Sequence, residues 1–321
     1  MIISFDSLRL VEIIKHLWAG ELLAIPTETV YGLAGDAANP LAVKKIFHLK
    51  QRPVDHPLIL HLAHQDLIAE WAINIPDFAW ELAKSFWPGA LTLILPKSAK
   101  VLPEITGGQS TVGIRIPNHP IALAILKAFE GGLVAPSANP FMGLSPTMAE
   151  HVVEFFGENL WVVDGGSCAV GIESTIIDCT QKVPELLRLG MITPAEIKAK
   201  TGITVKLKQA ASLKHAGQHP IHYAPLTPLR FFDTEMLCKY IMDSGDSQLG
   251  ILSYSFSKQF PVKKHIILSK NILEYATNFY AALHELDHAN CSEILVETPP
   301  QLPEWEPLHE RLKKASKRYT D

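Results

Sequence analysis

The sequence has little cysteine, and its few cysteines are too scattered for a familiar metal or disulfide motif. Cys168, Cys179, Cys238 and Cys291 form no C-x-x-C pair. This spacing argues against a zinc ribbon and against a disulfide framework, and it fits free thiols in a reducing compartment. A hydrophobic share of 47% in 321 residues is enough for a core without such staples.

Long apolar runs and a basic excess are also missing. No uninterrupted apolar stretch reaches the roughly 18 residues of a membrane span. Residues 1–6 carry neither a basic segment nor an apolar one of the secretory type. We therefore expect a cytoplasmic protein without membrane association. The formal net charge of −4 argues against broad nucleic-acid binding but leaves room for a local basic pocket.

What is present is an alternation of strand and helix patterns. Asp6-Ser7 and Asn39-Pro40 are typical helix starts. Apolar periodicity predicts two further helices, over residues 121–129 and 147–156. Short apolar runs predict strands over residues 22–25, 58–62, 91–95, 111–116, 133–135, 161–163 and 175–178. Strands that alternate with helices predict a layered α/β fold.

The periodicity fails between residues 206 and 227, which are rich in histidine, proline and glycine. Strand patterns return at 229–232, 249–252, 265–268 and 293–296, with a helical stretch over 271–286. We therefore predict a catalytic domain over 1–205, a linker or lid over 206–227, and a smaller α/β domain over 228–321.

Two cations stand close together at Lys50 and Arg52, directly before Pro53. Proline disfavours helix at the preceding residue, so we expect this pair at a helix end, on an exposed loop. Arginine can clamp phosphate with two hydrogen bonds, and lysine supplies a compact charge. The pair therefore suits a polyanion, although a solvated helix end is the more ordinary explanation of this motif taken alone.

Ser137 and Asn139 follow the expected strand over 133–135 and the turn former Pro136. Open α/β sheets bind ligands at the carboxyl ends of their strands. The two side chains would add neutral hydrogen-bonding groups there, although an ordinary turn has the same composition. The sequence contains no Walker A pattern, so any nucleotide site is not of the P-loop type.

Arg115 and His61 lie within or at the end of apolar strands. A buried guanidinium is costly without an anionic partner, which could be a ligand or a protein carboxylate. A histidine in this position could bind a ligand or be a satisfied core residue. Tyr31 could likewise pack over a ligand or in the core.

Taken together, the motifs resemble the Sua5/YrdC family of threonylcarbamoyl-AMP synthases. The resemblance covers roughly residues 8 to 225 and rests on runs at 26–33, 50–53, 57–61, 87–92, 113–117, 135–139, 164–166, 173–176, 188–190 and 222–225. The last run, His222-Tyr223-Ala224-Pro225, is similar to the linker of the two-domain form.

The resemblance implies a YrdC-like domain, with a twisted open mixed sheet and flanking helices, and a smaller Rossmann-like C-terminal domain. It implies an enzyme that condenses ATP, L-threonine and bicarbonate to threonylcarbamoyl-AMP and pyrophosphate. Mg²⁺ would accompany ATP without protein side-chain ligands. The product would feed the tRNA threonylcarbamoyl-transfer machinery, and we expect no stable direct binding of tRNA.

The resemblance also implies the site. Lys50, Arg52, Ser137 and Asn139 are the catalytic candidates. The ATP candidates are these four with His56, Thr111, Ser145, Arg188 and Tyr223, and the threonine candidates are Thr29, His61, Arg115 and Ser174. His56 and the linker residues 215–218 depart from the usual family pattern.

Two other functions share this fold. A double-stranded-RNA-binding module would use the same concave surface, but the acidic net charge and the lack of a basic stripe argue against it. The carbamoyl-transfer domain of hydrogenase maturation proteins normally accompanies zinc-binding cysteine pairs, which this sequence lacks.

Overall fold

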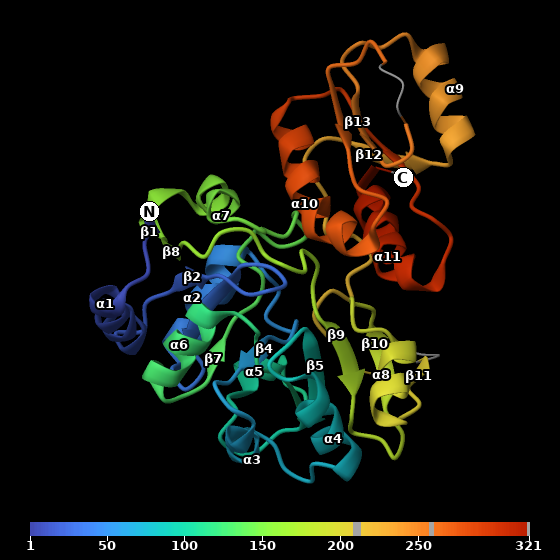
Figure 1. The fold of residues 1–321 in the computed structure, drawn as a ribbon. Coiled ribbons are helices and arrows are strands. Elements are labelled where there is room, and N and C mark those ends of the chain that lie inside the picture. Colours follow the sequence, from blue (N-terminus) through green and yellow to red (C-terminus); the bar gives the residue numbers. More distant parts are fainter. Residues whose placement is uncertain (208–212, 257–259, 320–321) are drawn as a thin grey trace. The chain divides into compact units, whose positions relative to one another are not determined.

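A computed structural model describes residues 1–207, 213–256 and 260–319 (Figure 1). The chain divides into two compact units, one of Met1–Phe141 with Pro146–Gln218 and one of Met142–Ser145 with His219–Asp321. This division falls inside the predicted linker, at residues 218 and 219. Residues 208–212 of that linker lie outside the described residues, and the predicted domain boundaries stay a prediction.

The strands of the first unit are β1 (Ile2–Ile3), β2 (Leu23–Ile25), β3 (Gly32–Asp36), β4 (Ile59–His61), β5 (Leu91–Pro96), β6 (Thr111–Arg115), β7 (Leu133–Val134), β8 (Trp161–Val163), β9 (Thr175–Asp178), β10 (Glu185–Arg188) and β11 (Lys206–Leu207). Within the described residues they form one sheet in the order β1-β8-β2-β3-β7-β4-β6-β5-β9-β10-β11. It contains both parallel pairs, such as β4 with β6, and antiparallel pairs, such as β5 with β6. The sheet is therefore mixed, as predicted.

The α-helices of the first unit are α1 (Ser7–Trp18), α2 (Pro40–Lys50), α3 (Ile68–Trp71), α4 (Asp77–Phe86), α5 (Pro103–Thr106), α6 (Pro120–Phe129), α7 (Ala149–Phe156) and α8 (Pro194–Thr201). Single 3₁₀ turns occur at η1 (Gln65–Leu67) and η2 (Gly157–Asn159). Asp6 and Asn39 cap α1 and α2 through their side chains, which confirms both predicted helix starts.

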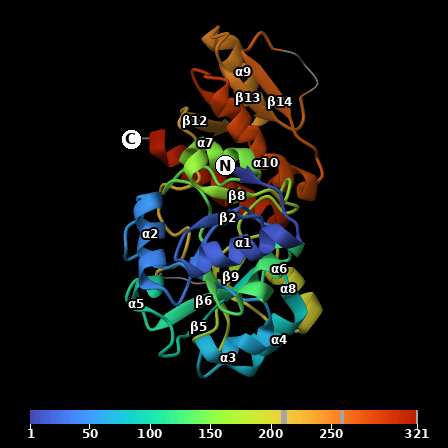
Figure 2. The ribbon, with the colours of Figure 1, turned by 90° about the vertical axis from the view of Figure 1, so that its left-hand side faces the viewer.

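Helices cover both faces of this sheet. Along β2, Leu23 and Ile25 pack with α1 and α6, which lie side by side in Figures 1 and 2. Ala24, between them, belongs to the larger core cluster that contains Val43 and Ile46 of α2. Successive strand residues point to opposite faces, so this alternation separates two apolar layers.

Strand β3 is one that the sequence patterns did not predict. It contains Gly32 and Gly35, which lowers its apparent strand propensity. A Cβ atom at Gly35 would lie 2.9 Å from Leu22 and 3.1 Å from Ile46. The glycine therefore allows close packing of the Leu22 and Ile46 side chains, which would have to shift to admit a Cβ atom.

The second unit contains β12 (Leu229–Phe232), α9 (Thr234–Ser244), β13 (Gly250–Ser253), β14 (Lys264–Ile267), α10 (Ile272–His288), β15 (Ile294–Glu297), η3 (Pro303–Trp305), α11 (Glu306–Ser316) and η4 (Lys317–Tyr319). Its strands pair in parallel in the order β12-β15-β13-β14. This parallel sheet with flanking helices is the predicted Rossmann-like arrangement. None of the helices in the described ranges is long and apolar enough to cross a membrane.

Gly190, just after β10, allows a close backbone contact that a larger residue would break. A Cβ atom there would lie 2.4 Å from the Thr175 amide nitrogen and 2.8 Å from the Glu173 carbonyl oxygen. We expect Gly190→Ala to destabilise the protein by about 1–3 kcal/mol and to speed amide exchange at residues 173–176. Urea unfolding and hydrogen exchange measure the two effects.

Gly202→Ala is the matched control, because Gly202 has a φ of +74° but no atom within 4 Å of an added Cβ. It should cost about 1 kcal/mol of stability without changing exchange at residues 173–176. Unchanged exchange in Gly190→Ala would contradict the close-contact explanation.

Candidate active site

Lys50 is the last residue of α2 and is buried, with 1% of its surface exposed. Its Nζ donates hydrogen bonds to the carbonyl oxygens of Ser137 and Asn139, at 2.5 Å each. The structure thus brings three of the four predicted catalytic residues together. The helix does end at this point, as predicted, with Gln51 in the left-handed conformation.

The expectation that Lys50 and Arg52 lie on an exposed loop is wrong. Arg52 is only 8% exposed, and its guanidinium donates to the carbonyl oxygens of Pro57 and His56 at 2.9 and 3.3 Å. The loop that follows α2 folds back over its own cations, which sequence spacing alone does not reveal. His56 is half-buried beside Arg52. Its ring contacts the ring of Phe141 edge-on, with 5.1 Å between the ring centroids.

Burial changes the charge balance around Lys50. Removal from water lowers its pKa well below the usual value, and the nearby charge of Arg52 lowers that pKa further. Two cations this close together and this far from water favour an anion between or beside them. The pair therefore remains suited to phosphate after the correction of its exposure.

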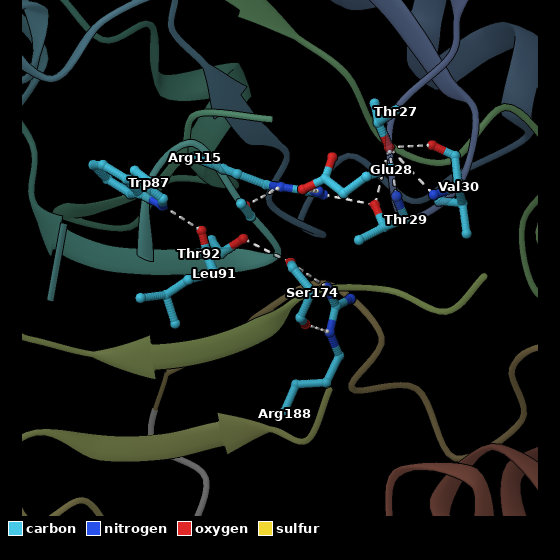
Figure 3. Close-up of polar contacts among 11 residues, drawn as sticks. Thr27, Glu28, Thr29, Val30, Trp87, Leu91, Thr92, Arg115, Ser174 and Arg188 are labelled. Carbon is cyan, nitrogen blue, oxygen red and sulfur yellow. Dashed lines mark hydrogen bonds and ion pairs between the residues drawn. The ribbon is translucent and has the colours of Figure 1, made fainter. Parts of the chain in front are cut away.

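Arg115, at the end of β6, forms the centre of a second polar cluster (Figure 3). It is 5% exposed, and its Nη2 lies 2.6 Å from Oε1 of buried Glu28. Its Nη1 donates to Thr29 Oγ1 at 2.8 Å, and its Nε donates to the Gly89 carbonyl oxygen at 3.2 Å. A protein carboxylate therefore pairs with Arg115, one of the two partners that the sequence left open.

Glu28 itself is not fully satisfied. Neither of its carboxylate oxygens receives a hydrogen bond within the described part of the chain, because the contact with Arg115 is an ion pair without hydrogen-bond alignment. Buried polar atoms normally have partners, so this carboxylate has unused acceptor capacity next to Arg115. That combination could receive an ammonium group near Glu28 and a carboxylate near Arg115.

His61 lies beside Arg115 on the neighbouring strand, since the two residues are register partners between β4 and β6. It is 3% exposed, and its Nδ1 donates to the Ile59 carbonyl oxygen at 3.2 Å. Burial first, and the charge of Arg115 second, lower its pKa to about 3. The ring is therefore neutral at pH 7 and retains Nε2 as an acceptor.

Ser174 and Arg188 join the two predicted subsites. Arg188 Nε donates to the Ser174 carbonyl oxygen at 2.9 Å, and Nη2 donates to its hydroxyl at 3.1 Å. The Ser174 hydroxyl also lies 2.8 Å from Thr92 Oγ1 (Figure 3). Arg188, predicted for ATP, thus contacts a residue predicted for threonine.

Thr111 opens β6 and lines a small cavity with Gly113, Ile176 and residues 214–216. Those three residues come from the predicted linker and dock on the first unit. Lys214 pairs with Asp55 at 2.6 Å, and the Ala216 carbonyl accepts from Arg188 at 3.3 Å. This part of the linker is therefore attached to the first unit.

Ser145 and Tyr223 belong to the second unit, whose position relative to the first is not determined. Within that unit the Ser145 carbonyl accepts from His284 Nε2 at 3.2 Å. Tyr223 is 1% exposed and packs against Tyr280 and the guanidinium of Arg311. Their predicted contacts with ATP stay predictions.

Sequence reasoning missed two contributors to the site, and the structure settles the ambiguity that the sequence left over Tyr31. Neither Thr92 nor Glu28 was given a role in the predicted site. Tyr31 is fully buried, and its hydroxyl donates to the Gly166 carbonyl and accepts from the Gly165 amide. Tyr31 is therefore a core residue. An acidic residue within the 26–33 run was the only sequence signal for Glu28.

Comparison with known proteins identifies two family models along the chain. The Sua5/YciO/YrdC model, described as "Telomere recombination", matches residues 15–190. The Sua5 C-terminal model, described as "Threonylcarbamoyl-AMP synthase, C-terminal domain", matches residues 192–317.

Similar curated proteins and solved structures carry related names. The threonylcarbamoyl-AMP synthase of Pyrococcus abyssi is 38% identical over 92% of this chain and 91% of its own length, and that of Bacillus subtilis is 37% identical over 92% and 89%. The crystal structure of P. abyssi Sua5 complexed with L-threonine matches with a TM-score of 0.90 and 35% identity, over 99% of this chain and 98% of that one. The chain therefore belongs to the Sua5/YrdC family, in its two-domain form.

Proposed function

We propose that this protein is a threonylcarbamoyl-AMP synthase. In this reaction the amine of L-threonine adds to the carbon of bicarbonate with loss of water, and the resulting carbamate oxygen displaces pyrophosphate from the α-phosphorus of ATP. The observation that carries the proposal is buried Arg115, with neutral His61 and the Thr29 hydroxyl beside it. Its end-to-end relative was crystallised with L-threonine.

Arg115 would hold the threonine carboxylate, and Glu28 would face the threonine nitrogen. The carboxylate oxygens of Glu28 have unused acceptor capacity, which suits an ammonium group. Once the guanidinium of Arg115 pairs with the threonine carboxylate, the ammonium group would balance the charge of Glu28. Neutral His61 and the Ser174 hydroxyl would complete the pocket without adding charge. Threonine would thus meet one group for each of its polar ends.

Lys50, Arg52 and Arg188 would neutralise the ATP phosphates. Adenylyl transfer develops charge on the α-phosphate and on the leaving pyrophosphate, so cations fixed in a dry site lower the barrier. Hydrogen bonds to protein carbonyls already hold all three in place, so their positions cost little reorganisation. Ser137, Asn139, His56 and Thr111 would contribute neutral contacts.

Mg²⁺ would enter with ATP. Among the described residues, no group of three or more His, Cys, Asp or Glu side chains is placed to hold a metal ion. We propose that phosphate oxygens and water supply most of its ligands, since Mg²⁺ keeps several waters when it binds with nucleotide phosphates. Bicarbonate use, transfer of the product to a tRNA-modifying partner and a cytoplasmic location belong to the same proposal.

The double-stranded-RNA alternative fits the burial of the cations poorly. Lys50, Arg115 and Arg188 are each at most 5% exposed. Side chains that bind duplex phosphates must reach a broad surface, whereas buried cations can reach only an anion that enters a pocket. A solved structure of full-length HypF shares this fold but is only 17% identical to this chain, so the similarity concerns the fold and not the function.

Reaction identity is tested by mass spectrometry of the purified full-length protein. Threonylcarbamoyl-AMP and pyrophosphate should form only when ATP, bicarbonate, L-threonine and Mg²⁺ are all supplied. Labelled bicarbonate should place its carbon in the product. AMP or pyrophosphate release that does not depend on threonine would contradict the proposal.

The ion pair between Arg115 and Glu28 gives a second prediction. Arg115→Gln leaves a buried carboxylate uncompensated, so stability should fall by about 3–5 kcal/mol. The double variant Arg115→Gln/Glu28→Gln removes both charges and should recover much of this loss. Threonine affinity should stay at least about tenfold weaker in both variants, since a charge-assisted bond is lost. Urea unfolding and calorimetry measure the two quantities.

ATP affinity is the internal control in these variants and should change less than threonine affinity. A double variant that regained normal threonine affinity would show that Arg115 only balances the charge of Glu28. That result would show that Arg115 does not bind threonine, but it would not contradict the proposed reaction, which mass spectrometry tests separately.

The low pKa of His61 predicts a pH dependence of stability. Its pKa is about 3 in the folded protein, against 6.5 when unfolded, so only the unfolded state takes up this proton between those values. Stability therefore falls as pH falls through this window, by about 1.4 kcal/mol per pH unit for one histidine. His61→Gln should lose that part of the slope in urea unfolding measured from pH 7 to 5. His64→Gln, at an exposed position, should keep it.

A further inference from the structure

A pocket of about 580 Å³ lies in the first unit, between α1, α2 and the turn that follows α7. None of the residues proposed for ATP or threonine lines it. Its volume is in the range of pockets that enclose small molecules. The proposed reaction therefore does not account for this pocket.

The interior of the pocket is apolar. Leu22 and Leu160 are buried at its base, and Leu49 and Phe156 are half-buried along its walls. Leu41, on the rim, exposes 67% of its surface. Covering such an exposed apolar side chain with a ligand removes its surface from water, which favours binding. The pocket thus favours an aliphatic or aromatic ligand body.

Helix α2 adds positive charge to one side of the pocket. Leu41, Lys44, Lys45 and His48 follow the i, i+3, i+4, i+7 spacing of a single helix face. Lys45 is already paired with Glu21 at 2.8 Å. Within the described residues, the side chains of Lys44 and His48 have no hydrogen bond or ion pair. The acidic residue of the pocket is therefore compensated, whereas two basic groups remain available.

His16 closes another wall in a fixed orientation. Its ring stacks on Trp161 with 4.4 Å between centroids, and its Nε2 donates to the Leu22 carbonyl oxygen at 3.0 Å. This wall is therefore preformed and presents a flat ring surface beside the apolar base. A preformed wall lowers the entropy cost of ligand binding.

We propose that this pocket binds a small amphipathic anion. A carboxylate or phosphate head would lie against Lys44 and His48, and an alkyl or aromatic body would fill the space over Leu22, Leu49 and Phe156. The argument is charge complementarity: the only uncompensated charge that the described lining offers is positive, and it stands at the edge of an apolar cavity. The proposal does not depend on the reaction assigned to the other site.

The test uses calorimetry on the full-length protein with four probes that each carry a ten-carbon chain: decanoate, decyl phosphate, decanol and decyltrimethylammonium. At least one of the two anions should bind at a single site, and the preferred anion identifies the head group. The alcohol should bind at least about tenfold more weakly, because it lacks the charge-assisted contact. The cation should not bind. Failure of both anions to bind, or equal affinity for the alcohol or cation, would overturn the proposal.

Two variants locate the binding. Lys44→Ala removes the free charge and should weaken anion binding at least about tenfold, and Asn159→Trp should block the cavity from its rim. Both side chains are exposed, so neither change should disturb the fold. Lys84→Ala on α4 is the matched control and should bind normally. Unchanged binding in both pocket variants would place the probe elsewhere and overturn the proposal. Threonine-dependent product formation should be normal in all three variants.

Discussion

The site depends on a guanidinium buried within a β-sheet. Arg115 lies on β6, which has strands on both sides in the eleven-stranded sheet, so water cannot solvate its charge from the edge. Such a group requires an anion, and Glu28 supplies one from the connection between β2 and β3. The positions of Thr29, Gly89 and His61 around it follow from this requirement, because each either bonds the guanidinium or shares its strand register.

The same physical constraint explains the position of Lys50. A helix C-terminus carries unpaired carbonyls that favour cations, but here the ammonium reaches past its own helix to the Ser137 and Asn139 carbonyls. These bonds tie the end of α2 to the segment after β7. The cost of burying the ammonium lowers its pKa, and a bound anion would offset that cost. The binding site and the local fold are thus stabilised by the same contacts.

Burial also separates the kinds of ligand that the two charged regions can take. The buried cations can be reached only by an anion that enters a pocket, whereas Lys44 and His48 are exposed and line a different, apolar pocket. The difference comes from α2 itself. Its final residue turns inward, while the face that carries Leu41 and Lys44 stays outside. One helix therefore supplies a charge to each region.

The sequence by itself determined the α/β class, most strands, several helix starts and the family. Local signals sufficed there: Asn39 caps a helix through its own side chain, and the apolar run 91–95 forms the strand that its pattern predicts. The run 26–33 and the other motifs resemble the family in sequence alone, without any knowledge of the structure.

Tertiary structure alone decided the exposure of the cations, the partner of Arg115 and the strand β3. Glu28 and Arg115 are distant in sequence, and only the strand order brings them within 2.6 Å. Lys50 and Arg52 look solvent-exposed in a local window because the carbonyls that bury Lys50 belong to residues 137 and 139. Gly35 weakens the strand signal of β3, yet it allows the close packing of Leu22 and Ile46. The contacts of Arg52 lie within its own loop, with His56 and Pro57. The contacts that decide Lys50, Arg115 and β3 come from residues outside the local window, so no local pattern contains them.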